Sequence, residues 1–144
     1  MPKGVMLSHY NILSDFDGLA QIFWVTRKDR LIGVLPFSDS LGFTGTLWLP
    51  LLSGFGVVYH PNSMDTKVVG DMVSRYKATI LLGTPTSYAA YLRGCSVEEF
   101  SSLRIALTCA EMLDEHLAKA FKEKYGLNLL EGYGCTEMAP VISV

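Results

Sequence analysis

Two glycines, an aromatic ring, a hydroxyl and a carboxylate stand within six residues of one another in Gly132-Tyr133-Gly134-Cys135-Thr136-Glu137. The glycines let backbone approach a ligand closely, and the ring of Tyr133 offers a face for stacking. The Thr136 hydroxyl suits a phosphate or a metal ion, and Glu137 is a hard oxygen ligand suited to Mg²⁺. The alternative is a plain strand-to-helix turn, with Thr136 and Glu137 capping a helix or lying in its first turn.

Five short apolar runs predict the strands that would position this segment: residues 31–35, 56–59, 79–82, 104–108 and 128–130. The runs are continuous rather than alternating, which is typical of parallel strands covered on both faces. Helical spacing appears over 68–76 and over 113–125, where Gly126 closes the pattern, and Ser8 is placed to cap an earlier helix. The alternation predicts an α/β fold, an open and mostly parallel sheet of about five strands in three α/β/α layers.

Small or polar residues follow four of these runs, at 36–39, 83–86, 109–111 and 132–137. In open parallel sheets, ligands bind beyond the carboxyl ends of the strands. If the strands are parallel, all four loops converge on one edge of the sheet. We therefore expect a shared site there.

The bulk composition excludes several other classes of protein. A chain of 144 residues that is 49% hydrophobic predicts one domain, and a net charge of −2 argues against nucleic acid as a partner. The three cysteines lack a CxxC spacing, which favours reduced thiols over disulfides or zinc. No signal peptide is recognisable, so we expect a cytoplasmic location.

The apolar stretch at 41–59 requires a membrane test. A spanning helix needs about 20 consecutive apolar residues. Several glycines and Pro50 interrupt this stretch, and Ser53-Gly54 is placed as a turn. We predict a buried helix, a turn and a buried strand, and a membrane segment is the alternative.

Two longer motifs carry a family resemblance. Residues 2–13 (PKGVMLSHYNIL) and 131–140 (EGYGCTEMAP) resemble signatures of the adenylate-forming superfamily of acyl-CoA synthetases and luciferases. In that family a phosphate loop leads into Pro-Lys-Gly-Val, and Tyr-Gly-x-Thr-Glu follows over a hundred residues later. The resemblance extends over essentially the whole chain. Residues 49–58, 81–93 and 130–144 are most similar to the acyl-ACP synthetase half of bifunctional 2-acylglycerophosphoethanolamine acyltransferases, and then to long-chain acyl-CoA synthetases.

The resemblance implies ATP and Mg²⁺ as cofactors and assigns roles by position. Thr136 would contact the ATP phosphates and Glu137 would hold Mg²⁺, so these two are the expected catalytic residues. The remaining expected nucleotide-binding residues are Lys3, Ala110, Glu111, Gly132, Tyr133 and Gly134, with the Tyr133 ring stacked on adenine. Asp39, Thr84 and Pro85 are expected near the substrate, although relatives usually carry His where this chain has Asp39.

The implied reaction is AMP-forming ligation. A fatty carboxylate attacks the α-phosphate of ATP and expels pyrophosphate. The acyl group of the acyl-AMP then passes to the thiol of CoA or of an acyl carrier protein's phosphopantetheine, and AMP is released. Such a ligase would serve phospholipid acylation or fatty-acid recycling. The alternative is a non-catalytic α/β domain that binds a nucleotide or a partner and shares only the fold.

The resemblance also implies that residues 1–144 are the central fragment of the large domain. The Ser/Thr/Gly-rich part of the phosphate loop, the ribose-binding aspartate and the small C-terminal domain with the catalytic lysine have no counterpart here. We expect the fragment alone to be inactive and to self-associate through exposed apolar surface. Any membrane association of the parent protein would come from regions outside this chain.

Other residue types have simpler explanations. His9, His60 and His116 are far apart, which disfavours a metal site. Cys109 and Cys135 are expected to be small packing residues rather than nucleophiles. Four large aromatic residues predict core packing, with the lining of an acyl tunnel as the alternative: Trp24, Trp48, Phe43 and Phe55.

Overall fold

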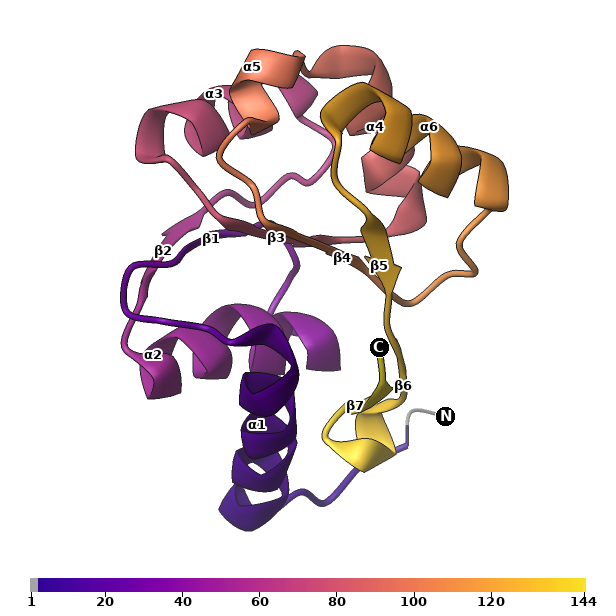
Figure 1. The fold of residues 1–144 in the computed structure, drawn as a ribbon. Coiled ribbons are helices and arrows are strands. Elements are labelled where there is room, and N and C mark those ends of the chain that lie inside the picture. The colour runs from indigo at the N-terminus through magenta and orange to yellow at the C-terminus, as the bar shows by residue number, and fades with distance from the viewer. Residues whose placement is uncertain (1–2) are drawn as a thin grey trace.

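A sheet of five parallel strands forms the centre of the computed structural model, which describes residues 3–144 (Figure 1). The strands are β1 (Arg30–Gly33), β2 (Gly56–Tyr59), β3 (Ile80–Gly83), β4 (Ile105–Thr108) and β5 (Leu129–Glu131). Their order across the sheet is β2-β1-β3-β4-β5, and every neighbouring pair is parallel. The predicted fold class is therefore confirmed, and the carboxyl ends of all five strands meet at one edge.

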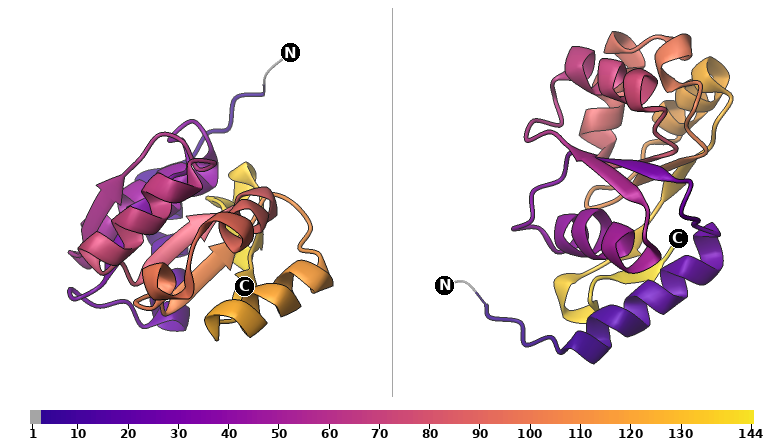
Figure 2. Two further views of the ribbon diagram at one scale, coloured as in Figure 1. Left: turned by 90° about the horizontal axis from the view of Figure 1, so that it is seen from above. Right: turned by 90° about the vertical axis from the view of Figure 1, so that its left-hand side faces the viewer.

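Helices cover both faces of the sheet. One face carries α3 (Thr66–Tyr76), α4 (Pro85–Gly94), α5 (Val97–Phe100) and α6 (Glu115–Tyr125), above the sheet in Figure 1. The other face carries α1 (His9–Phe23) and a π-helix, η1 (Gly42–Trp48), which continues directly into α2 (Leu49–Ser53). The two further views show the same layers, with α1 running alongside the end of the chain (Figure 2).

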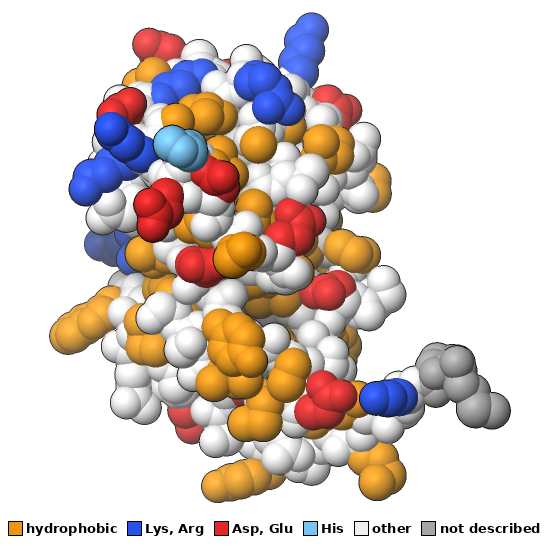
Figure 3. All heavy atoms as spheres, turned by 90° about the vertical axis from the view of Figure 1, so that its right-hand side faces the viewer, with side chains coloured by type: hydrophobic (Ala, Val, Ile, Leu, Met, Phe, Trp, Pro, Cys, Tyr) orange, Lys and Arg blue, Asp and Glu red, His pale blue; other side chains and the backbone are white. Residues whose placement is uncertain are grey.

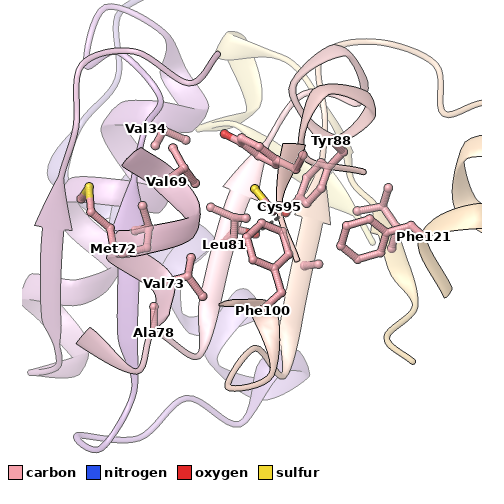
Figure 4. Packing of buried hydrophobic residues seen from close by; sticks show 14 residues of the cluster. Val34, Val69, Met72, Val73, Ala78, Leu81, Tyr88, Cys95, Phe100 and Phe121 are labelled. Atoms are coloured by element: carbon pink, nitrogen blue, oxygen red, sulfur yellow. Dashed lines mark hydrogen bonds between the residues drawn. The ribbon is translucent and has the colours of Figure 1, made fainter. Parts of the chain in front are cut away.

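Successive side chains of the central strands point into two different cores. Ile32 and Leu81 belong to the cluster beneath α3–α6, whereas Leu31 and Ile80 belong to the cluster beneath α1 and η1. Figure 4 shows the first cluster, in which Tyr88 and Phe121 meet edge to face at 5.3 Å between ring centroids. The continuous apolar runs in the sequence thus supply both faces of a sheet whose central strands are buried.

Side-chain caps fix where the helices begin. Ser8 accepts the backbone N–H of Asn11, as the sequence predicts, and Asp65 and Asp114 cap α3 and α6. Thr84 caps α4, and Pro85 occupies the first turn of that helix. Two helices, α4 and α5, lie between β3 and β4. The periodicity of the sequence did not mark a specific helix in this region.

The apolar stretch at 41–59 forms a helix, a turn and a strand, as predicted. Gly54 makes the turn with φ of 72°, a left-handed conformation that glycine adopts without a Cβ penalty. The strand differs from the prediction because β2 lies at the edge of the sheet and is only partly buried. Across the described residues, every helix is too short or too polar to span a bilayer.

An ion pair between the buried Asp29 and the exposed Arg104 ties the amino-terminal edge of the sheet together. Arg104 donates two 2.8 Å hydrogen bonds to the Asp29 carboxylate, and the Thr79 hydroxyl donates a third at 2.7 Å. Burial by itself would raise the pKa of Asp29, but the hydrogen bonds from Arg104 and Thr79 outweigh it and hold that pKa well below its usual range. Because these residues precede β1, β3 and β4, the pair aligns three strands at the edge opposite the strand-end loops.

Beyond β5 the chain leaves the sheet and folds back as a small hairpin. Its strands are β6 (Tyr133–Gly134) and β7 (Val141–Ser143), and a 3₁₀ turn, η2 (Thr136–Met138), joins them. The hairpin lies beside α1 (Figures 1 and 2). The residues of the terminal motif are thereby held between the sheet edge and the first helix.

Candidate functional site

A cleft opens at the carboxyl ends of β1, β4 and β5. Its inner lobe, about 190 Å³, is lined by the loop after β1 and by Cys109, Ala110 and the hairpin. Its outer lobe, about 550 Å³, lies on the other side of the same hairpin strand and includes Glu111 and Glu131. Ala110, Gly132, Tyr133 and Gly134 line both lobes. Three of the four predicted loops therefore meet in one cleft.

The fourth loop, residues 83–86, does not line the cleft but is hydrogen-bonded to a residue that does. The Thr86 hydroxyl and backbone N–H donate to the Glu111 carboxylate at 2.7 and 3.3 Å. Thr84 accepts the Ser87 N–H at 3.3 Å as a helix cap, and Pro85 is buried in the first turn of α4. Neither Thr84 nor Pro85 lines the two lobes, so their expected substrate role remains a prediction.

Tyr133 is well placed for stacking. Its side chain is 67% exposed and lies between the two lobes. An exposed ring held on a strand presents a rigid flat face at small entropic cost. The expected stacking of Tyr133 on adenine remains a prediction.

The two neighbouring glycines are required by the fold itself. A Cβ on Gly132 would lie 2.7 Å from the sulfur of Cys109. A Cβ on Gly134 would collide with the carbonyl oxygen of Pro140. Because both residues lack a Cβ, the segment 132–134 packs closely against the end of β4 and against Pro140. This close packing places Tyr133 at the rim of the cleft.

A strained backbone conformation shapes the loop after β4. Ala110 has φ of 74°, in the left-handed region that residues with a Cβ rarely adopt. The Glu111 carboxylate accepts from Thr86, and the Glu131 carboxylate accepts the Leu113 N–H at 2.9 Å. These bonds tie the loop after β4 to α4 and to β5, and Ala110 lines both lobes of the cleft together with Tyr133.

Asp39 acts as a helix cap in the structure. Its Oδ1 accepts the backbone N–H groups of Leu41 and Gly42 at 2.9 and 3.2 Å, at the start of the helical segment that becomes η1. Asp39 also lines the inner lobe. The Asp39 carboxylate is therefore partnered by backbone donors, while it adds a negative charge to the cleft.

Thr136 and Glu137 lie in the 3₁₀ turn of the hairpin. The Thr136 hydroxyl donates to the Ser40 hydroxyl at 3.1 Å, which links the turn to the loop after β1. Glu137 is exposed and lines a separate cavity of about 440 Å³ between α1 and the hairpin, which we call the α1 cavity. The two predicted catalytic residues thus face neighbouring spaces. Lys3 lies exposed ahead of α1 and lines neither space.

Asp15 is a site residue that sequence reasoning missed. Its Oδ1 accepts the Val141 N–H at 3.2 Å, and its buried Oδ2 has no hydrogen-bond partner within residues 3–144. Burial raises the pKa of Asp15 to about 6, although the Val141 bond opposes the shift. Asp15 lines the α1 cavity together with Glu137, so a helix near the start of the chain contacts the terminal motif directly.

The charges around the cleft decide how a nucleotide would fit. Among the described lining residues, the charged side chains of the two lobes are all acidic: Asp39, Glu111 and Glu131. On the face shown in Figure 3, acidic side chains lie across the middle and basic ones gather toward one end. A polyphosphate would therefore need a cation. Glu137 is an exposed oxygen donor, and Mg²⁺ commonly binds one or two carboxylates together with substrate phosphates.

Cys109 is buried against Gly132 on the wall of the inner lobe. Burial raises the pKa of the Cys109 thiol to about 11, and the negative charges of Asp39 and Glu131 contribute in the same direction. A thiol with that pKa stays protonated at neutral pH and is a poor nucleophile. The predicted packing role of Cys109 agrees with its position.

Comparison with known proteins identifies relatives of this arrangement. The AMP-binding enzyme family matches residues 1–144. A long-chain-fatty-acid–CoA ligase of Bacillus subtilis (strain 168) is 28% identical over 144 residues, which are 97% of this chain and 26% of that protein. The crystal structure of apo MatB from Rhodopseudomonas palustris superposes with a TM-score of 0.89 at 27% identity, and covers 99% of this chain and 28% of that one.

A third similar protein was solved with ligands. O-succinylbenzoate coenzyme A synthetase (MenE) of Bacillus subtilis, in complex with ATP and a magnesium ion, has a TM-score of 0.86 at 25% identity. The match covers 99% of this chain and 30% of that one. The chain therefore spans between about a quarter and a third of the length of these relatives.

Proposed function

Because the chain belongs to the AMP-binding enzyme family over residues 1–144, we propose that it is the central part of the large domain of an ATP-dependent fatty-acid ligase. The ligase joins a fatty acid to AMP and then transfers the acyl group to the thiol of CoA or of an acyl carrier protein. A small C-terminal domain that carries a lysine completes the enzyme.

One observation carries this proposal: Tyr133, Ala110 and Asp39 line a single cleft at the carboxyl ends of parallel strands. Ligands of open α/β sheets bind at this edge. The cleft pairs an exposed aromatic ring with the hydroxyl of Thr136, and the next residue of the turn, Glu137, presents a carboxylate to the neighbouring α1 cavity. Adenine and phosphate groups require these two kinds of surface.

The described residues have distinct tasks in this reaction. Tyr133 stacks on the adenine ring, and Thr136 donates its hydroxyl to a phosphate oxygen in exchange for its bond to Ser40. Glu137 would hold Mg²⁺, which would supply positive charge for the phosphates. Since the lobes are lined with acidic side chains, the remaining positive charge comes from lysines outside them, Lys3 among the candidates.

The fatty-acid preference rests on one relative, the long-chain-fatty-acid–CoA ligase of Bacillus subtilis. It is supported by an apolar wall of the cleft. Leu41 and Val141 line the inner lobe and also belong to the apolar surface between α1, η1 and the sheet. An acyl chain that enters past Asp39 would therefore meet apolar side chains.

The test is a pyrophosphate-release assay on the full-length protein with ATP, Mg²⁺ and fatty acids of graded chain length. We expect release that depends on both the fatty acid and Mg²⁺, followed by thioester formation with CoA or with a phosphopantetheinylated carrier protein. Aromatic acids serve as the matched comparison. Binding of ATP without pyrophosphate release from any carboxylic acid would instead favour a non-catalytic nucleotide-binding domain.

A further inference from the structure

We propose that Thr44 is a positioning residue that holds the turn carrying Thr136 and Glu137 in its working conformation. The proposal rests on the function proposed above. Thr44 lies in the middle of η1 and is 3% exposed. Its hydroxyl donates a 3.1 Å hydrogen bond to the carbonyl oxygen of Ala139, a residue 95 positions further along the chain. Thr44 therefore acts on the terminal motif from a different element.

Ala139 is the point at which the turn needs support. It follows η2 directly and has φ of 77°, a left-handed conformation that disfavours residues with a Cβ. Such a conformation persists only where the surroundings hold it in place. Ala139 is itself buried, so a carbonyl left without its donor would be left unsatisfied away from water. The Thr44 hydroxyl thus stabilises the end of the turn.

Two further contacts hold the same turn. Ser40 accepts from Thr136 at one end, and Asp15 accepts the N–H of Val141 just past the other. The Ser40 contact is a hydrogen bond between two hydroxyls that line the cleft. In the proposed function, a phosphate oxygen would replace the Ser40 hydroxyl as the acceptor. The Thr44 contact is buried, and neither Thr44 nor Ala139 lines the two lobes. We therefore expect the Thr44 hydrogen bond to hold the end of the turn both with and without a bound nucleotide.

The two buried threonines of the π-helix η1 donate to different partners. A π-helix is rare and occurs most often at functional sites. Thr46, two residues further on, is also fully buried, but its hydroxyl donates at 2.6 Å to the Gly42 carbonyl of its own helix. The chain thus offers a matched pair of buried threonines, one that contacts the turn and one that does not.

The first experiment measures the contact in this chain without any ligand. Native-state hydrogen exchange is followed at the amides of Met138 and Ala139, which donate within the turn at 3.0 and 3.3 Å. We expect Thr44→Val to raise their exchange rates roughly five- to tenfold, the effect of losing one hydrogen bond of ordinary strength. Thr44→Ser keeps the hydroxyl and should restore slow exchange. Thr46→Val should leave both amides unchanged.

The second experiment uses the full-length protein. We expect Thr44→Val to weaken MgATP binding, measured by calorimetry, and to lower kcat/KM for adenylation about tenfold, with Thr44→Ser close to the parent. A role in stability alone would reduce the amount of folded enzyme and leave the affinity of that enzyme for MgATP unchanged. Thr46→Val shows that second pattern if the reasoning is correct.

The outcomes separate this proposal from the proposed function. Equal exchange at Met138 and Ala139 in Thr44→Val and Thr46→Val overturns the positioning role. Faster exchange in Thr44→Val with parental MgATP affinity and kcat/KM overturns it as well. If the parental full-length protein adenylates no carboxylic acid, the proposed function fails, and the exchange rates still decide whether Thr44 fixes the turn.

Discussion

Replacing Asp15 by asparagine should stabilise the protein at neutral pH, because the native fold disfavours the charge on this carboxylate. Oδ1 accepts the Val141 N–H, whereas the buried Oδ2 lacks a hydrogen-bond partner within residues 3–144. Asparagine keeps a carbonyl oxygen for Val141 and removes the charge. The matched control is Asp17→Asn, since Asp17 is exposed on the same helix.

The size and sign of the effect follow from the pKa. Burial raises the pKa of Asp15 from 3.8 to about 6, so between these values the native state binds a proton that the unfolded state has released. Stability therefore falls as pH rises from about 4 to about 6, and it stays lower above that window. A shift of about two units corresponds to roughly 3 kcal/mol at full burial, but the Asp15 side chain is only partly buried, and solvent screening reduces this to about 1 kcal/mol.

Urea denaturation of the parent, Asp15→Asn and Asp17→Asn at half-unit steps from pH 4 to pH 8 measures this difference. We expect Asp15→Asn to exceed the parent by about 1 kcal/mol above pH 6.5, with a melting temperature about 3 °C higher, and to match it near pH 4. Asp17→Asn should follow the parent throughout. An Asp15→Asn protein that is less stable than the parent at pH 7.5, or that differs by the same amount at every pH, would refute the reasoning.

Four further expectations concern other parts of the molecule. In the full-length protein, Glu137→Gln should lower the adenylation rate roughly 100- to 1000-fold, because the transition state loses metal-dependent stabilisation. Adenylation rates measured against Mg²⁺ concentration test this, with circular dichroism as the folding control. A folded variant that adenylates at the parental rate would show that Glu137 is only a turn residue. Arg104→Ala should lower the unfolding free energy by about 2 kcal/mol in urea titrations, because the buried Asp29 carboxylate loses its charged partner but keeps the hydrogen bonds from Thr26 and Thr79. A loss below about 0.5 kcal/mol would contradict this. This chain by itself should release no pyrophosphate above background. The chain should also form dimers or larger species in light scattering, since large apolar side chains such as Met6 and Trp24 are exposed. A monomer at high protein concentration would contradict this expectation of self-association.

The sequence predicts the sheet well because its central strands are buried on both faces. Continuous apolar runs such as 79–82 and 104–108 are typical of that environment, and β3 and β4 lie there. The run at 56–59 is as apolar as the others, yet β2 lies at an edge and is partly exposed. Strand order depends on how the crossovers pack, and no single run contains that information.

Polar residues at strand ends were harder to interpret. Thr84 and Pro85 attract attention as possible substrate contacts, and the structure uses both to begin α4. The same residue types cap helices and bind ligands, because both tasks require a hydroxyl near free backbone groups. The preference for one task depends on whether a helix follows, and a short helix such as α4 leaves a weak periodic signal.

Part of the site depends on contacts that local patterns do not contain. Thr44 bonds a residue 95 positions away, Ser40 meets Thr136 across 96 positions, and Asp15 meets Val141 across 126. Each of these side chains looks unremarkable within its own segment. Motif residues such as Tyr133 and Glu137 stand out in the sequence, whereas the residues that hold them in place emerge only from the fold.

The division of each central strand between two cores has a genetic consequence. Ile80 and Leu82 point to one cluster and Leu81 to the other, so one extra codon within β3 would send every following side chain of the strand to the wrong face. Both cores would lose their fit at once, and frame-preserving insertions there should be eliminated by selection. The same codon inserted among residues 61–64, in the connection between β2 and α3, would lengthen only a loop. Length variation among natural copies of this gene should therefore collect in such connections.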